Sequence, residues 1–221
     1  MLRLLSYITI TFIILLAFPS SHSRAHKSSK ETKAVTSVEY DRLLVDRAVK
    51  ICKNVRNKNI DMARRNAHRL LEVEKNVGIP MLMYGMTLAA ACSESGFSES
   101  AKGDHRFSKK RKPKAIGVLQ LWPWVKKYGV DRMNLESSAD FWLRHIVRQH
   151  RSIKRRCKPR TKLKAWRQAW VTAIRAPKKT GRCNETPKHW RMFLKLQKFQ
   201  RTLTIKASNK LGNVDGHKET N

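Results

Sequence analysis

The sequence predicts a mainly α-helical domain built around one buried helix, with a small irregular or β region beside it. Apolar residues recur at helical spacing over most of 39–205. One segment, PMLMYGMTLAAAC at 80–92, is apolar almost throughout, whereas the stretch 97–114 has no helical period. Because a helix without a polar face has to be enclosed by other elements, we expect the remaining helices to pack around residues 80–95.

Two amphipathic helices precede the buried one. The first has an apolar face made of Leu44, Ala48, Ile51, Cys52 and Val55. The second has one made of Ala63, Ala67, Leu70 and Leu71. Gly78 and Pro80 then break the pattern. We place Pro80 in the first turn of the buried helix and Gly96 just past its end.

Four further helices are predicted after the loop. Residues 122–128 form a short helix that Gly129 ends, and Ser137 is the expected N-cap of the next. A third helix stops near Pro177, and Pro187 opens the last. The apolar side of the last helix consists of Trp190, Phe193, Leu194 and Gln197.

The N-terminus has the pattern of a secretory signal peptide. A short basic start is followed by an apolar core at 4–18 and a short polar stretch with small residues. An uncleaved anchor is the alternative, but the core is short for a membrane span. We therefore expect an exported monomer, periplasmic or extracellular, without a transmembrane segment in its mature form. The predicted divisions are a signal peptide at 1–25, a flexible leader at 26–38, one domain at 39–205 and a polar tail at 206–221.

The four cysteines predict two disulfides in an exported chain. Three pairings are possible for Cys52, Cys92, Cys157 and Cys183. We favour Cys52 with Cys92, which would tie the leading helices to the buried helix, and Cys157 with Cys183. Free buried cysteines are the alternative. No CxxC spacing occurs, so we expect no metal site.

The charge of the chain points to a polyanionic partner. The sequence has 48 Lys and Arg against 16 Asp and Glu, a formal net charge of +32. Cell-wall polymer, anionic lipid, lipopolysaccharide or nucleic acid would each fit this charge. Export argues against nucleic acid. We expect the basic run at 106–114 to contact an anionic cell envelope, a solvated loop being the alternative.

Glu94 has the setting of a general acid. It lies at the end of the buried helix, where the helix dipole and apolar neighbours both disfavour negative charge. We expect both effects to raise the pKa of its carboxyl group. A carboxylic acid that keeps its proton near neutral pH is what cleavage of a glycosidic bond requires. An exposed glutamate at a fraying helix end is the alternative.

Two motifs flanking the basic loop strengthen this interpretation. They are ACSESGF at 91–97 and AIGVLQLWP at 115–123, with Gln120 following Glu94 by 26 residues. This pair resembles the active-site core of the lysozyme-like lytic transglycosylases, the group of the soluble lytic transglycosylases and goose-type lysozymes. The resemblance covers about 77–124 and implies a lysozyme-like fold. It also implies cleavage of peptidoglycan between N-acetylmuramic acid and N-acetylglucosamine, with Glu94 as the single acid and base and no cofactor.

The resemblance also implies roles for residues around Glu94. Ser95 matches a serine that helps to position acid or substrate, and Gln120, in the turn that starts at Gly117, would line the sugar groove. Asp104 is either a second carboxylate or a loop-fixing residue, and we favour the latter. One of the two tryptophans that flank Pro123 is a candidate for stacking on a sugar ring.

One segment departs from the family pattern. The tyrosine and asparagine of the family's Ala-Tyr-Asn segment are replaced by Ile174 and Arg175. Lytic transglycosylation is the favoured reaction, because no strong second carboxylate is evident. A hydrolytic lysozyme and a catalytically inactive, cationic envelope-binding protein stay open as alternatives.

The basic loop gives a prediction that separates docking from catalysis. Reversing Lys109, Lys110, Arg111 and Lys112 to glutamate should weaken binding to purified cell wall strongly at low salt. The effect should be slight at high salt, because salt screens charges over about 8–10 Å. Cleavage of uncharged sugar oligomers should change little. Wild-type wall binding by the reversed variant at low ionic strength would contradict the docking role.

Overall fold

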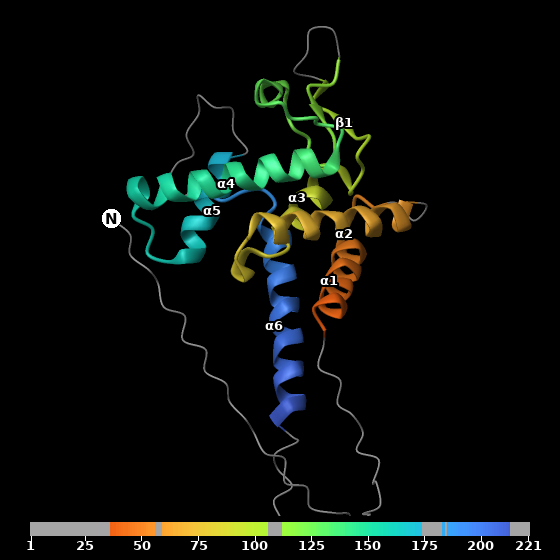
Figure 1. The fold of residues 1–221 in the computed structure, drawn as a ribbon, viewed down its shortest axis with the longest axis vertical. Helices are drawn as coiled ribbons and strands as arrows, with labels where there is room; N and C mark the ends of the chain where they lie inside the picture. Colours follow the sequence, from red (N-terminus) through yellow and green to blue (C-terminus); the bar gives the residue numbers. More distant parts are fainter. Residues whose placement is uncertain (1–35, 56–58, 106–111, 174–182, 184, 213–221) are drawn as a thin grey trace, which may run out of the picture. The chain divides into compact units, whose positions relative to one another are not determined.

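The computed structural model describes residues 36–55, 59–105, 112–173, 183 and 185–212. This part of the chain is mainly helical with a small two-stranded sheet, as the sequence predicts (Figure 1). Its elements are α1 (Ser37–Ile51), α2 (Ile60–Val77), η2 (Met81–Met83), α3 (Met86–Ser95), β1 (Lys102–Gly103), β2 (Ala115–Ile116), η4 (Pro123–Tyr128), α4 (Leu135–Cys157), α5 (Lys162–Ala173) and α6 (Trp190–Gly212). No helix in the described ranges has the length and apolar character that a membrane crossing needs. The predicted signal peptide at 1–25 lies outside these ranges.

Several boundaries differ from the sequence-based ones. Helix α1 begins two residues before the predicted domain start, because the Thr36 side chain caps it by accepting a hydrogen bond from Glu39 N at 3.2 Å. Helix α6 continues to Gly212, into the predicted polar tail. The N-cap of α4 is Asn134 and not Ser137, whose N–H donates to Asn134 Oδ1 at 2.8 Å.

Helix α3 is the centre of the packing. It contacts α1, α2 and α6, while α4 packs against both α2 and α5 (Figure 1). Every residue from Met86 to Cys92 is buried. The apolar segment is therefore enclosed by other helices, as predicted.

The start of the buried helix differs from the prediction at Pro80. That residue precedes only the short 3-10 turn η2, and α3 begins at Met86 after Gly85. Gly85 has φ +84°, a left-handed conformation that ends one turn and starts the next. The apolar run is thus two elements, divided by a turn at Gly85. Apolar character alone does not reveal this turn.

A buried carboxyl group from α2 caps α3. Glu74, which is 0% exposed, accepts hydrogen bonds from Gly85 N at 2.6 Å, from Thr87 N at 2.6 Å and from the Thr87 hydroxyl at 2.5 Å. Burial raises the pKa of Glu74 to about 7, although these hydrogen bonds act in the opposite direction. The first turn of α3 therefore depends on a carboxyl group that titrates near neutral pH.

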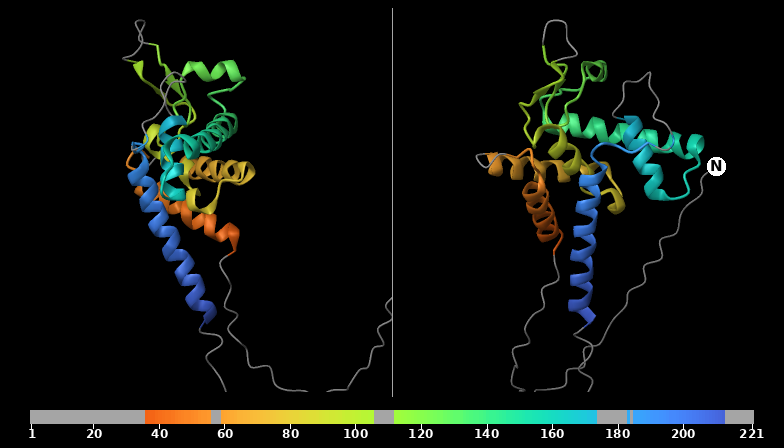
Figure 2. Two further views of the ribbon diagram at one scale, coloured as in Figure 1. Left: turned by 90° about the vertical axis from the view of Figure 1, so that its left-hand side faces the viewer. Right: turned by 180° about the vertical axis from the view of Figure 1, so that it is seen from behind.

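The small sheet and the η4 turn lie together beside the helices (Figure 2). Strands β1 and β2 pair antiparallel, with Lys102 opposite Ile116 and Gly103 opposite Ala115. The η4 turn ends at Gly129, as predicted, which has φ +73°. This region packs at the C-terminal end of α3, since the Ser95 hydroxyl donates to Val118 O at 2.7 Å.

Both favoured disulfides are present. Cys52 is bonded to Cys92, with 5.6 Å between Cα atoms, and Cys157 is bonded to Cys183, with 5.4 Å. The first joins the end of α1 to α3, two residues before Glu94. The second joins the end of α4 to the segment that leads into α6.

The buried carboxyl of Glu74 predicts a pH dependence of stability. Between pH 4.5 and 7 the folded chain keeps a proton that the unfolded chain loses, so the free energy of unfolding should fall by about 3 kcal/mol as pH rises through this window. Urea unfolding of wild type and Glu74→Gln measures the effect. The variant should lack this contribution, so parallel stability curves for the two proteins would contradict it.

Candidate active site

Three backbone contacts fix the last turn of α3, which carries Glu94. Gly96 caps the helix at φ +61° and donates its N–H to Cys92 O at 3.2 Å. The side chain of Asn54 donates to the same carbonyl at 2.9 Å and to Ser93 O at 3.2 Å. A Cβ on Gly96 would lie 2.5 Å from Asn54 O, so only glycine fits here. Glu94 is thus at the end of a well-capped helix, not at a fraying one.

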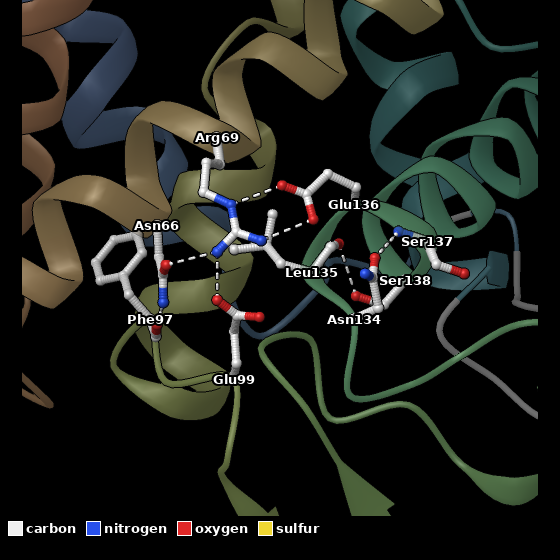
Figure 3. A network of polar contacts seen from close by, with 9 residues as sticks. All are labelled: Asn66, Arg69, Phe97, Glu99, Asn134, Leu135, Glu136, Ser137 and Ser138. Carbon is white, nitrogen blue, oxygen red and sulfur yellow. Dashed lines mark hydrogen bonds and ion pairs between the residues drawn. The ribbon is translucent and has the colours of Figure 1, made fainter.

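A polar network holds the chain just after this turn (Figure 3). Asn66 on α2 donates to the carbonyl of Phe97, a buried residue with φ +67°, at 2.8 Å. Arg69 donates to Asn66 Oδ1 at 3.1 Å, forms an ion pair with Glu99, and binds both oxygens of Glu136 at 2.6 and 2.8 Å. The network joins α2, the segment after α3 and the first turn of α4, so Glu94 is supported from three elements.

Ser95 and Gly117 position the turn beside Glu94. The Ser95 hydroxyl donates to Val118 O at 2.7 Å and lies 3.1 Å from Ala91 O. Gly117 has φ +82°, and a Cβ there would lie 1.8 Å from Arg132 O. Ser95 therefore fastens the glycine-led turn to α3, and Gly117 lets that turn approach the chain before α4.

Gln120 lines both of the clefts described below, but its side chain is hydrogen-bonded to its own loop. It has φ +50°, and its Nε2 donates to Ala101 O at 3.0 Å and to Gly117 O at 2.9 Å. Both amide hydrogens are therefore bonded to main-chain oxygens. Its Oε1 lies so close to Gly103 that a Cβ there would be 2.3 Å away. The side chain joins the β1 segment to the turn and offers a ligand an acceptor only.

Asp104 fixes one of the two candidate tryptophans. Its Oδ2 accepts a hydrogen bond from Trp122 Nε1 at 2.9 Å, and Lys114 Nζ lies 5.7 Å from the centre of the Trp122 ring. Trp122 is 37% exposed. Trp124 packs edge-on against Phe141, with 6.0 Å between ring centres. Both tryptophans line the cleft described next.

Glu94 stands between two clefts. One, of about 380 Å³, is bordered by Asp104, Trp122 and Trp124. The other, of about 430 Å³, is bordered by Asn54, Asn59, Met62 and Lys102. Both are lined by Glu94, Gly103 and Gln120. The side chain of Glu94 is 20% exposed at their junction.

Two residues that sequence reasoning did not associate with Glu94 contact its carboxyl group. Lys188 Nζ and His189 Nε2 each lie 2.8 Å from Glu94 Oε1. Burial raises the pKa of Glu94, but the hydrogen bonds from His189 and Lys188 outweigh this, so the pKa lies below its ordinary value. The expected rise in pKa is therefore wrong, because two donors converge on one oxygen.

The sequence contains little that would reveal these two contacts. Lys188 and His189 were expected inside a helix opened by Pro187, whereas α6 begins only at Trp190. The two residues form the turn before it, with Trp190 N donating to Pro187 O at 3.0 Å. A proline just before an apolar helix was the available signal, and it does not show which element the turn faces.

Some predicted features fall outside the described residues. These are Ile174, Arg175 and most of the basic run, 106–111. Among the residues that are described, no three His, Cys, Asp or Glu side chains come together as metal ligands would.

Comparisons of the chain with protein-family models, with curated proteins and with solved structures find no match.

Gly117 provides a test of the turn beside Glu94. Gly117→Ala should destabilise the fold by more than about 2 kcal/mol, because it adds a backbone clash to the cost of positive φ, about 1–2 kcal/mol. Gly129→Ala is the matched control, since Gly129 also has positive φ but nothing lies within 4 Å of its added Cβ. Urea unfolding compares the two. Equal losses would mean that close packing of the turn has no energetic role.

Proposed function

We propose that this chain is an exported enzyme that cleaves the glycan strands of peptidoglycan, with Glu94 as the acid and base. The observation that carries the proposal is the position of Glu94: a mostly buried carboxyl group at the junction of two clefts. A polymer lying across both clefts would place one of its bonds beside this group. The high positive charge and the two disulfides fit an exported protein that acts on an anionic wall.

The cleft that contains Trp122 and Trp124 suits sugar rings. Aromatic side chains present an apolar face, and a sugar ring has apolar C–H faces that can lie against it. Asp104 orients Trp122 through its indole N–H. The second cleft contributes the amide of Asn59, which can bond hydroxyl and acetamido groups, and Oδ1 of Asn54 as an acceptor, since the Asn54 Nδ2 is bonded to Cys92 O and Ser93 O.

The proposed reaction is lytic transglycosylation. Glu94 gives its proton to the bridging oxygen as the bond from that oxygen to C1 of the muramyl sugar breaks. The 6-hydroxyl of the same sugar then attacks C1 and returns its proton to Glu94, which leaves a 1,6-anhydro ring. Hydrolysis would instead need an activated water. Asp104, the other carboxylate bordering the first cleft, is engaged with Trp122, which supports the route without water.

Glu94 has to gain a proton before it can act as an acid. The contacts with His189 and Lys188 both oppose this, and the exposed one, with Lys188, has to loosen when substrate binds. The same contact favours a second candidate function, a non-catalytic envelope-binding protein in which Lys188 permanently neutralises Glu94. Turnover separates the two candidates.

Replacing the acid tests the proposal. Glu94→Gln should release no soluble muropeptides from purified wall, because the amide keeps the shape of the side chain but cannot transfer the proton. Mass spectrometry should find 1,6-anhydro ends in the wild-type products. Glu72→Gln is a matched control, since Glu72 is 63% exposed on α2, and it should act as wild type. Wild-type turnover by the Glu94 variant would reject the assignment, and an inactive wild type would favour the binding protein.

A further inference from the structure

The two donors to Glu94 differ in how firmly they are held. His189 is 1% exposed, and its ring lies beside Trp170, with 6.1 Å between ring centres. Its Nδ1 is buried without a hydrogen-bond partner in the described part of the chain, and Nε2 donates to Glu94. Lys188, in contrast, has a side chain that is 64% exposed. Because water can solvate the ammonium group of Lys188 but does not reach the ring of His189, Lys188 can leave Glu94 while His189 stays.

Lys188 also borders a separate cleft rich in positive charge. This basic side cleft, of about 260 Å³, contains four cationic side chains: Lys53, Lys188, Arg191 and Lys195. No acidic side chain is among the described residues that line it. Lys188 lines the tryptophan-bearing cleft as well. Its side chain therefore joins the basic side cleft to the tryptophan-bearing cleft at Glu94.

We propose that the basic side cleft binds carboxylates carried by the peptide stems of the glycan strand, and that Lys188 moves from Glu94 to such a carboxylate when the strand binds. The inference rests on the proposed function and assigns the part of the substrate for which the enzyme would be specific. Lys53, Arg191 and Lys195, joined by Lys188 once it leaves Glu94, attract an anionic group and discriminate against a neutral one. A peptide stem projects from the sugar backbone, so it can enter a side cleft while the sugars occupy the groove.

The movement of Lys188 would prepare the acid. The titratable groups that share a cleft or a hydrogen bond with Glu94 are Lys188, His189, Asp104 and Lys102. When Lys188 leaves, burial is opposed by one donor fewer, so the pKa of Glu94 rises. A strand that carries peptide stems thereby favours the protonated form of Glu94, whereas an uncharged oligomer leaves Lys188 bound to Glu94. Lys188 is thus a residue that sets specificity.

Two substrates and two variants test this assignment. The substrates are glycan strands with peptide stems and uncharged N-acetylglucosamine oligomers of equal length, and kcat/KM is measured on both across pH. Lys188→Gln should reduce the wild-type preference for stem-bearing strands on the order of tenfold, the equivalent of about 1.4 kcal/mol. The alkaline limb of its pH profile should move to higher pH. Lys198→Gln, an exposed lysine of α6 outside the cleft, should match wild type. Equal losses on both substrates would overturn the assignment.

A measurement without turnover separates this inference from the proposed function. Carbon-13 NMR follows the Glu94 carboxyl, identified by its absence in Glu94→Gln, while a synthetic stem peptide with free carboxylates is added. The peptide should raise the pKa of Glu94, its fully amidated form should not, and Arg191→Gln should weaken the response. Inorganic phosphate tests whether any small anion suffices; an equal response to it would overturn assignment to peptide stems. If the stem peptide raises the pKa of Glu94 but the chain cleaves no wall, the proposed enzymatic function is refuted and the binding role of the basic side cleft is supported. If the chain cleaves wall but the stem peptide leaves the pKa of Glu94 unchanged, the enzymatic function is supported and the binding role of the basic side cleft is refuted.

Discussion

Helix α3 is buried from Met86 to Cys92, and the rest of this structure depends on the need to satisfy the end groups of that helix. The terminal N–H and C=O groups of α3 have to find partners inside the protein. Glu74 supplies them at the first turn, and Asn54 and Gly96 supply them at the last. Because the capping groups come from different parts of the chain, α3 cannot be satisfied before α1 and α2 have packed against it.

The same requirement places Glu94. Its turn is joined to α1 through Asn54 and the Cys92 disulfide, to the glycine-led turn through Ser95, and to α2 through the carbonyl of Phe97. A carboxyl group at such a position has little freedom, so the clefts on its two sides have a fixed relation to it. The residues around Glu94 therefore mainly hold its turn and the neighbouring loop in place, including Gln120, whose amide hydrogens are bonded to main-chain oxygens.

Helical periodicity and the positions of glycine and proline were sufficient to predict the helical class, the buried segment and the glycine that ends α3. The even number of cysteines in a chain expected to be exported predicted both disulfides. These patterns could not predict the division of the apolar run at Gly85, since its cause is a buried carboxyl eleven residues earlier. Lys188 and His189 were missed for a similar reason. Their contact with Glu94 spans about half the chain, and it depends on how α6 packs against α3. The local sequence pattern predicts which face of a helix is apolar. It does not predict which turn of a distant element that face contacts.

The pKa of Glu94 shows the limit of reasoning from burial alone. Position on a buried helix implies a carboxyl group that resists ionisation, and burial does raise its pKa. Yet a carboxyl group buried without donors would leave its oxygens unsatisfied, and the fold avoids this by bringing His189 and Lys188 to Oε1. A fully buried second donor would have made the low pKa permanent. Because the side chain of Lys188 is 64% exposed and that of His189 only 1%, one of the two donors to Glu94 is held by the core and the other is in contact with solvent.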